Sequence, residues 1–283
     1  MLVGNLRATF EPRAVTVRGR RLELVPLSSG GFNTVYTMPA HPSVVLRVSG
    51  ALGADDQRAY RREIAVQKRL AALGLSPRVF ATLAQRLGAR ARIGVVMERF
   101  DGTLEDVLRD AASTRRVFAE HDGERALAEL FLRVSRVTSC VDTKAANVVV
   151  RYVAGPVELA MIDVDPYFCA DRRGAACAAF AKCLAAASPR SAVHAAVSLL
   201  ILTLDAARLR PAVALPWPNL LAAMRAAWPT LERALCADAR GGSAGLGAEA
   251  SAMEQIAHYT GITTVSGARR ALERAAAHAR DAS

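Results

Sequence analysis

Short apolar runs separated by turn residues occupy most of the first hundred positions and predict β-strands. Residues 14–48 form the longest stretch of this kind, with a glycine-containing segment at 28–33 and a turn at 39–42. Two further apolar runs, at 78–80 and 93–97, predict two more strands. This part of the chain is therefore expected to be rich in β-strands.

One segment within this region has helical spacing instead. The helix is expected to begin near Asp55 or Asp56, either of which suits the N-cap, and to end at about Leu73 before Gly74. Four apolar residues and one glutamate share a stripe of that helix: Ala59, Glu63, Val66, Leu70 and Leu73. Because a carboxylate on a buried stripe needs a cation, we expect Glu63 to pair with Arg47 on the preceding strand.

Beyond residue 102 the apolar spacing becomes almost entirely helical. Thr103 to Asp106 has the features of a helix start, with an acid placed as in a capping box. Further helices are expected at about 122–139, 174–187, 190–209, 217–237, 249–259 and 266–281. The segment Glu98–Gly102 is a plausible linker between the two patterns. The sequence thus predicts an α+β protein with a strand-rich domain at 1–100, a helical domain at 101–283 and a cleft between them.

Two short apolar runs interrupt the helical part of the chain. The first follows Asn147, the second ends at Asp163, and residues 154–156 supply a Gly-Pro turn, so the runs predict an antiparallel hairpin. Paired strands place the start of one beside the end of the other, which brings Asn147 and Asp163 together, with Asp142 and Lys144 in the entering loop. Two carboxylates, an amide oxygen and an ammonium group are what a magnesium-nucleotide phosphotransfer site requires.

The chain is strongly basic, with a formal net charge of +11, but its cations are scattered along the sequence. Only Lys68, Lys144 and Lys182 are lysines among the 37 basic residues, which is typical of a GC-rich coding sequence. The arginines have no interleaved aromatic residues, so specific nucleic-acid binding is not expected. The scarcity of lysine makes the one at position 144 more informative.

Cysteine usage and apolar run length bear on where the protein works. The five cysteines include no Cys-x-x-Cys pair, which favours a reduced intracellular protein over a disulfide framework or a zinc site. The longest apolar run, around 192–207, contains His194 and Asp205, so a buried core helix is expected there rather than a membrane span. Met1–Arg7 has no features of a secretory signal. We therefore expect a cytoplasmic protein without membrane partners.

Six segments carry a resemblance to the protein-kinase-like superfamily, over about residues 22–168. They are a glycine-rich loop at 27–36, a strand cation within Val45–Val48, the helix glutamate Glu63, a hinge strand at Val95–Glu98, a catalytic loop at Cys140–Asn147 and a metal-binding segment at Ile162–Asp165. Each segment alone is weak evidence, but the six occur in the family's order. The resemblance implies a bilobal fold, with a small antiparallel-sheet N-lobe containing one helix and a larger, mostly helical C-lobe.

The resemblance also implies roles for individual residues. Asp142 would orient the acceptor hydroxyl and Lys144 would neutralise the transferring phosphoryl group, while Asn147 and Asp163 would hold Mg²⁺. The residues expected to serve the nucleotide are Ser29, Gly30, Gly31, Val35, Arg47, Glu63, Met97 and Glu98. These roles predict a kinase of the Ser/Thr type that uses ATP and Mg²⁺ and phosphorylates a protein.

Departures from the family pattern leave two alternatives open. Arg47 stands where the family has a lysine, and its guanidinium is bulkier, so a catalytically impaired pseudokinase-type binding module is one alternative. Asp165 and the short stretch before helices resume resemble small-molecule kinases of the aminoglycoside-phosphotransferase type, which is the other. Cys140 and Val141 replace the family's histidine and arginine, so an arginine-dependent activation switch is not expected. Divergent kinases of large DNA viruses share such mixtures, and that origin would place the protein in a host cytoplasm.

Overall fold

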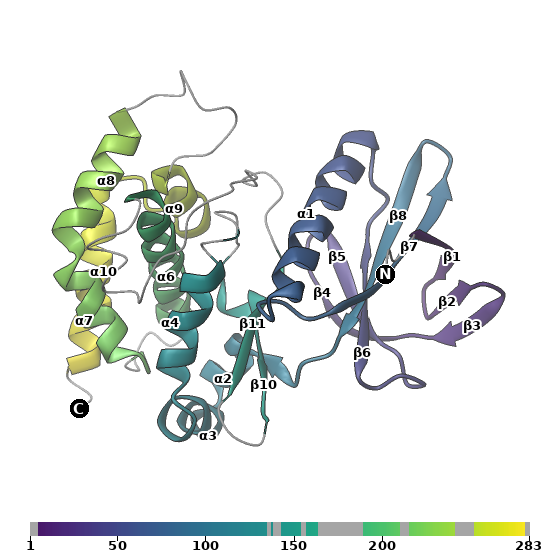
Figure 1. Ribbon diagram of the computed structural model, residues 1–283, viewed down its shortest axis with the longest axis horizontal. Coiled ribbons are helices and arrows are strands. Elements are labelled where there is room, and N and C mark those ends of the chain that lie inside the picture. Colours follow the sequence, from purple (N-terminus) through teal and green to yellow (C-terminus); the bar gives the residue numbers. More distant parts are fainter. Residues whose placement is uncertain are drawn as a thin grey trace. The chain divides into compact units, whose positions relative to one another are not determined.

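A computed structural model of the protein describes residues 5–134, 137, 143–153, 157–163, 189–209, 215–240 and 252–280. The chain divides into two compact units, residues 1–100 and 101–283, where the sequence predicts a linker. The first unit combines a large sheet with one long helix, and the second consists of helices and a small sheet (Figure 1). The protein is therefore of the α+β class.

The sheet of the first unit has eight strands in the order β3-β2-β1-β7-β8-β6-β5-β4. The strands are β1 (Asn5–Glu11), β2 (Ala14–Val17), β3 (Arg20–Glu23), β4 (Val25–Ser29), β5 (Asn33–Thr37), β6 (Val44–Ser49), β7 (Val79–Leu87) and β8 (Arg90–Glu98). Neighbouring strands pair antiparallel, except that β1 and β7 pair parallel. The prediction of a small antiparallel sheet was therefore incomplete, because it did not include strand β1 or the parallel pairing of β1 with β7.

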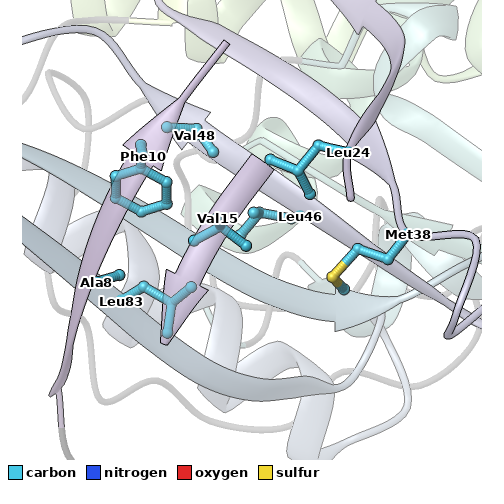
Figure 2. Close-up of a cluster of buried hydrophobic side chains, with 8 residues drawn as sticks. All are labelled: Ala8, Phe10, Val15, Leu24, Met38, Leu46, Val48 and Leu83. Carbon is cyan, nitrogen blue, oxygen red and sulfur yellow. The ribbon is translucent and has the colours of Figure 1, made fainter. Parts of the chain in front are cut away.

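On one face of this sheet, side chains of β1 and β2 pack with side chains of β6 and β7 in a buried apolar cluster (Figure 2). The cluster consists of Ala8, Phe10, Val15, Leu24, Met38, Leu46, Val48 and Leu83. The ring of Phe10 packs directly on the backbone of β8 at Gly94. A Cβ at this position would lie 2.8 Å from Phe10 Cζ, so a larger residue would clash with the ring. Side chains alternate between the two faces of a strand. Arg47, between Leu46 and Val48, and Ile93 and Val95, on either side of Gly94, therefore point to the opposite face.

Helix α1 (Ala54–Ala72) packs on that opposite face. Its buried residues are Tyr60, Glu63, Ile64, Gln67 and Leu70, and they meet a second cluster that includes Val45, Ile93, Val95 and Met97. The predicted stripe was wrong in part, because Ala59 and Val66 are only half-buried and Leu73 is 50% exposed. The large side chains of Tyr60 and Ile64 offer more apolar area than Ala59 and Val66, and the helix turns that side to the sheet.

Of the two predicted ends of α1, only the C-terminal one matches the structure. The N-cap is Gly53, which makes no side-chain cap bond, so the prediction of Asp55 or Asp56 as the cap was wrong. Both acids instead lie in the first turn, where carboxylates interact favourably with the helix dipole. The predicted stop is confirmed, since Gly74 follows the C-cap Leu73 with a φ of +68° that favours glycine.

The second unit contains these elements: β9 (Gly102–Thr103), α2 (Leu104–Arg109), α3 (Ala111–Arg115), the π-helix η1 (Arg116–Glu120), α4 (Gly123–Val134), the 3₁₀-helix η2 (Ala145–Asn147), β10 (Val148–Arg151), β11 (Glu158–Met161), α6 (Pro189–Leu209), α7 (Pro218–Ala226), α8 (Trp228–Arg240), α9 (Ala252–Thr260) and α10 (Val265–Arg280). The short strands form a sheet in the order β11-β10-β9. Helix α6 contacts η2, α2, α4, α8, α9 and α10, as expected of a core helix. Of the helices in the described ranges, none is both long and apolar enough for a membrane span.

Most helix predictions for this unit are confirmed in position. The capping box is present: Thr103 N–H donates to Asp106 Oδ2 at 2.9 Å, and Asp106 N–H donates to Thr103 Oγ1 at 3.1 Å. The single helix predicted at 217–237 was wrong, because α7 and α8 are separate and Pro229 belongs to the first turn of α8, where a proline is tolerated. The helix predicted at 174–187 lies outside the described residues.

Candidate functional site

The first unit contains a buried ion pair on the α1 side of its sheet. Arg47 Nη2 lies 2.5 Å from Glu63 Oε1, and the two side chains are only 7% and 3% exposed. Strand β6 directs Arg47 to this side because its neighbours Leu46 and Val48 point into the cluster of Figure 2. The predicted pairing of Arg47 with Glu63 is confirmed.

Two residues that the sequence prediction missed complete the surroundings of this pair. Arg47 Nη2 also donates to Gln67 Oε1 at 3.1 Å, and Gln67 lies one helical turn after Glu63 on the same buried stripe. The guanidinium of Arg47 lies 5.3 Å from the ring centroid of Tyr60, whose hydroxyl donates to Asn33 Oδ1 at 2.9 Å. A polar residue four positions from Glu63 was the available signal for Gln67. The charge of Arg47 is therefore enclosed by a carboxylate, an amide and an aromatic face.

Two other predicted nucleotide residues of the sheet, Val35 and Met97, lie on the same side as the ion pair. Val35 of β5 and Val95 of β8 are the register partners of Arg47 on either side, so the three side chains form a row across the sheet. Met97 is 5% exposed, and its Sδ accepts a hydrogen bond from Gln67 Nε2 at 3.7 Å. Glu98 ends β8, and Oε2 of its carboxylate accepts the backbone N–H of Arg78 at 3.2 Å.

The glycine-rich segment forms a tight turn between β4 and β5. Ser29 is the last residue of β4, and Gly30 N–H donates to the carbonyl of Asn33 at 2.8 Å. A Cβ at Gly31 would meet no atom within 4 Å, so the turn has open space around it. The neighbouring Phe32 is 77% exposed. The turn is therefore accessible to solvent.

A hollow of about 340 Å³ lies beside this turn, but on the opposite side of the sheet from Arg47. Its lining includes Phe10, Leu24, Tyr36 and Val48, all of which belong to or pack against the cluster of Figure 2. Because neighbouring residues of β6 point to opposite faces, this hollow and the row containing Arg47 are separated by the sheet.

In the second unit, the predicted hairpin is confirmed. Strands β10 and β11 pair antiparallel with Val148 opposite Met161, and Ile162 N–H donates to the carbonyl of Asn147 at 2.8 Å. Asn147 and Asp163 therefore flank the open end of the hairpin. Asp163 has a φ of +64°, a left-handed conformation that aspartate tolerates better than most residues.

The chain entering the hairpin is fixed to helix α6. Ala145 N–H donates to Asp205 Oδ2 at 2.8 Å, and Asn147 N–H donates to the carbonyl of Lys144 at 2.9 Å. Asp205 was not predicted as a site residue, although a single carboxylate within the apolar stretch 192–207 was a signal that it serves a specific partner. The backbone of this loop is thus anchored from the helical core.

Of the two residues predicted to be catalytic, Lys144 is among the described residues and Asp142 is not. Lys144 is exposed, and its Nζ lies 5.4 Å from the ring centroid of Tyr259 on α9, within cation–π range. Asp142 lies outside the described residues, as do Cys140, Val141 and Asp165.

The hairpin end offers donors that suit Mg²⁺. The amide oxygen of Asn147 and the carboxylate of Asp163 are hard oxygen ligands, and protein Mg²⁺ sites commonly use one or two carboxylates with phosphate and water oxygens. Within the described ranges, no group of three or more His, Cys, Asp or Glu side chains gathers as a candidate metal site.

Comparison with known proteins does not place this chain in a family. No protein-family model matches it, and no curated protein matches it significantly.

Proposed function

We propose that this protein is a divergent protein-kinase-like phosphotransferase that moves the γ-phosphate of ATP to the hydroxyl of a Ser or Thr side chain in another protein. The observation that carries the proposal is the β10–β11 register, which brings Asn147 and Asp163 to one hairpin end directly after Lys144. The buried Arg47–Glu63 pair and the Gly30-Gly31 turn support it, because the resemblance expects a cation–glutamate pair and a phosphate loop in the strand-rich unit. The bilobal kinase-like fold is part of the same proposal.

Each residue would contribute a distinct part of the chemistry. Bound Mg²⁺ would neutralise charge on the phosphate oxygens, with Asn147 and Asp163 as its protein ligands. Lys144 would stabilise negative charge on the phosphoryl group in flight, and Asp142 would orient the attacking hydroxyl and accept its proton. Asp205 would keep the loop backbone in place, so that these side chains need little reorganisation.

The proposal is tested by following melting temperature and phosphate transfer in the full chain. Mg-ATP should raise the melting temperature in proportion to the logarithm of its concentration once it exceeds the dissociation constant. Labelled phosphate should be transferred to a generic basic protein or to the chain itself. Asp142→Asn should abolish transfer while leaving the nucleotide-dependent shift, and Asp163→Asn should reduce both.

A matched control separates the site from general effects of the substitution. Asp122 also has a positive φ, of +50°, and is exposed, so Asp122→Asn makes the same chemical change in the same backbone conformation away from the hairpin. It should leave both readouts unchanged. The proposal fails if millimolar Mg-ATP gives no shift, or if Asp122→Asn and Asp163→Asn behave alike.

One observation favours a binding module as the second candidate function. The guanidinium of Arg47 is engaged by Glu63 and Gln67 in a space that leaves the arginine 6% exposed. A cation enclosed in this way is less available to phosphates than a lysine ammonium on a flexible stem. A nucleotide-dependent shift without any transfer, in both the wild type and Arg47→Lys, would favour this candidate. Transfer only to a sugar or an aminoglycoside would favour a small-molecule kinase.

A further inference from the structure

The positive charge of the protein resides almost entirely in the first unit. Residues 1–100 contain 16 basic and 6 acidic residues, a net charge of +10, whereas residues 101–283 contain 21 basic and 20 acidic residues, a net charge of +1. An asymmetry of this size between two parts of one chain points to a polyanionic partner for the basic part.

Coding bias does not explain the asymmetry. A drift from lysine to arginine leaves charge unchanged, and it would act on both units alike. The units differ most in their acids, because 6 acidic residues in 100 are about half the density of 20 in 183. Glu63 is buried together with Arg47, so this pair leaves the balance of surface charge unchanged. Two of the exposed acids, Glu11 and Asp55, pair with arginines, but outside the buried pair the first unit still has 15 basic residues against 5 acidic ones.

Helix α1 arranges five of these cations on its outer side. They are Arg58, Arg61, Arg62, Lys68 and Arg69, which recur at the spacings of three, four and seven residues that define one side of a helix. The four arginines are exposed, although Arg58 pairs with Asp55 in the first turn, and Lys68 is half-buried, while the opposite side of α1 is packed on the sheet (Figure 1). From Arg58 to Arg69 the row extends about 16 Å at the helical rise per residue. We call these five residues the α1 basic face.

We propose that the α1 basic face binds the phosphodiester backbone of nucleic acid without reading its sequence. Arginine guanidinium groups form paired hydrogen bonds with phosphate oxygens, and a row of about 16 Å covers roughly five steps of a duplex. The face has no aromatic side chain to stack on bases and no amide side chain to pair with adenine, and contacts of its cations with phosphates carry no sequence information.

The same face is poorly suited to a membrane surface. An amphipathic helix that lies in the headgroup region needs a free apolar side to insert, beside its cationic side. The apolar side of α1, with Tyr60, Ile64 and Leu70, is already buried in the unit. Nucleic-acid binding by this face also does not depend on the proposed phosphotransfer, because Arg47 and Glu63 lie on the buried side of the arrangement.

The test is fluorescence anisotropy of a labelled duplex DNA of arbitrary sequence, titrated with the full chain. At salt concentrations from about 50 to 200 mM, the logarithm of affinity should fall linearly with the logarithm of salt, with a slope near −0.9 per phosphate neutralised. The triple variant Arg61→Gln/Arg62→Gln/Lys68→Gln should bind about tenfold or more weakly, and its salt slope should be smaller by about two to three. Arg61→Lys/Arg62→Lys keeps the charge and should retain most of the affinity.

A control variant removes the same charge from the other unit. Arg225, Arg270 and Arg274 are exposed residues of α7 and α10, so their triple exchange to Gln gives a chain of equal net charge. This control should lose far less affinity than the α1 variant, and the Mg-ATP melting shift should be the same in both. Equal losses in the two triple variants would overturn the proposal. So would salt-independent binding, or tighter binding to phosphatidylserine vesicles or polyglutamate than to DNA.

Discussion

The two units hold their candidate site residues in different ways. In the first unit the charged side chains themselves are buried and paired, as Arg47 and Glu63 are. In the second unit the charged group of Lys144 is exposed, and it is the loop backbone that is fixed, through Ala145 to Asp205 and through Asn147 to Ile162. In the first unit, therefore, removing one candidate residue leaves a buried charge without its partner, whereas in the second unit the exposed candidate Lys144 can be changed without that cost.

The largest expected effect is at the buried pair. Glu63→Ala should lower the free energy of unfolding by about 3–5 kcal/mol, because Arg47 is left buried without its carboxylate. Urea denaturation measures this loss. The apolar double variant Arg47→Met/Glu63→Leu should recover much of it, since both buried charges are then removed.

A control for this prediction comes from the second unit. Glu129 pairs with Arg125 four residues away on α4, with both side chains more than half exposed, so Glu129→Ala removes an ion pair from solvent instead of the core. Its unfolding curve should scarcely change, since exposed pairs contribute little. A similar loss for both variants would contradict the distinction between the units.

A smaller effect is expected at the loop anchor. Asp205→Ala leaves the Ala145 N–H without its carboxylate acceptor, and the loss of such a hydrogen bond costs about 1–3 kcal/mol. Asp205→Asn keeps an acceptor oxygen and should lose less. Urea denaturation and the Mg-ATP melting shift together measure whether stability and nucleotide response fall in parallel. Identical results for the two variants would show that the carboxylate–amide bond is not what matters there.

The smallest effect concerns the contact between Lys144 and Tyr259. A cation–π contact at an exposed site contributes about 0.5–1 kcal/mol, so Tyr259→Leu should cost about that much, while Tyr259→Phe keeps the ring and should be neutral. A double-mutant cycle with Lys144→Met isolates the pair. A coupling energy of zero in the cycle would show that the contact between Lys144 and the ring does not stabilise the protein.

The sequence predicted local geometry well where pattern and chemistry agreed. The hairpin followed from two apolar runs around a turn, and the Arg47–Glu63 pair followed from a carboxylate on a buried stripe. The stripe of α1 was assigned one position away because Ala59 and Val66 fit the spacing as well as Tyr60 and Ile64 do, and only packing against the sheet distinguishes them. Glu63 belongs to both stripes, which is why the pairing survived the error.

What the sequence could not supply were partners distant along the chain. Strand β1 pairs with a strand more than seventy residues later, and Asp205 binds Ala145 from 60 residues away. Neither contact leaves a local pattern, although the alternation of Leu6, Ala8 and Phe10 was a weak sign of a strand. The position of Asp205 in the apolar stretch of α6 indicated that its carboxylate has a polar partner, but not that the partner is the backbone of Ala145.

The parallel pairing of β1 with β7 has a consequence for how the first unit is made. Of the strands in this sheet, β1 is synthesised before the others, yet it lies between β2 and β7, and its parallel neighbour is synthesised only after α1. Closing so long a loop is entropically costly and slow, because the non-local contacts form only after that entropy has been lost. The three strands β1, β2 and β3 can pair locally at once, but β7 and most of the apolar cluster come later, and until then Ala8 and Phe10 remain available to chaperones or to aggregation.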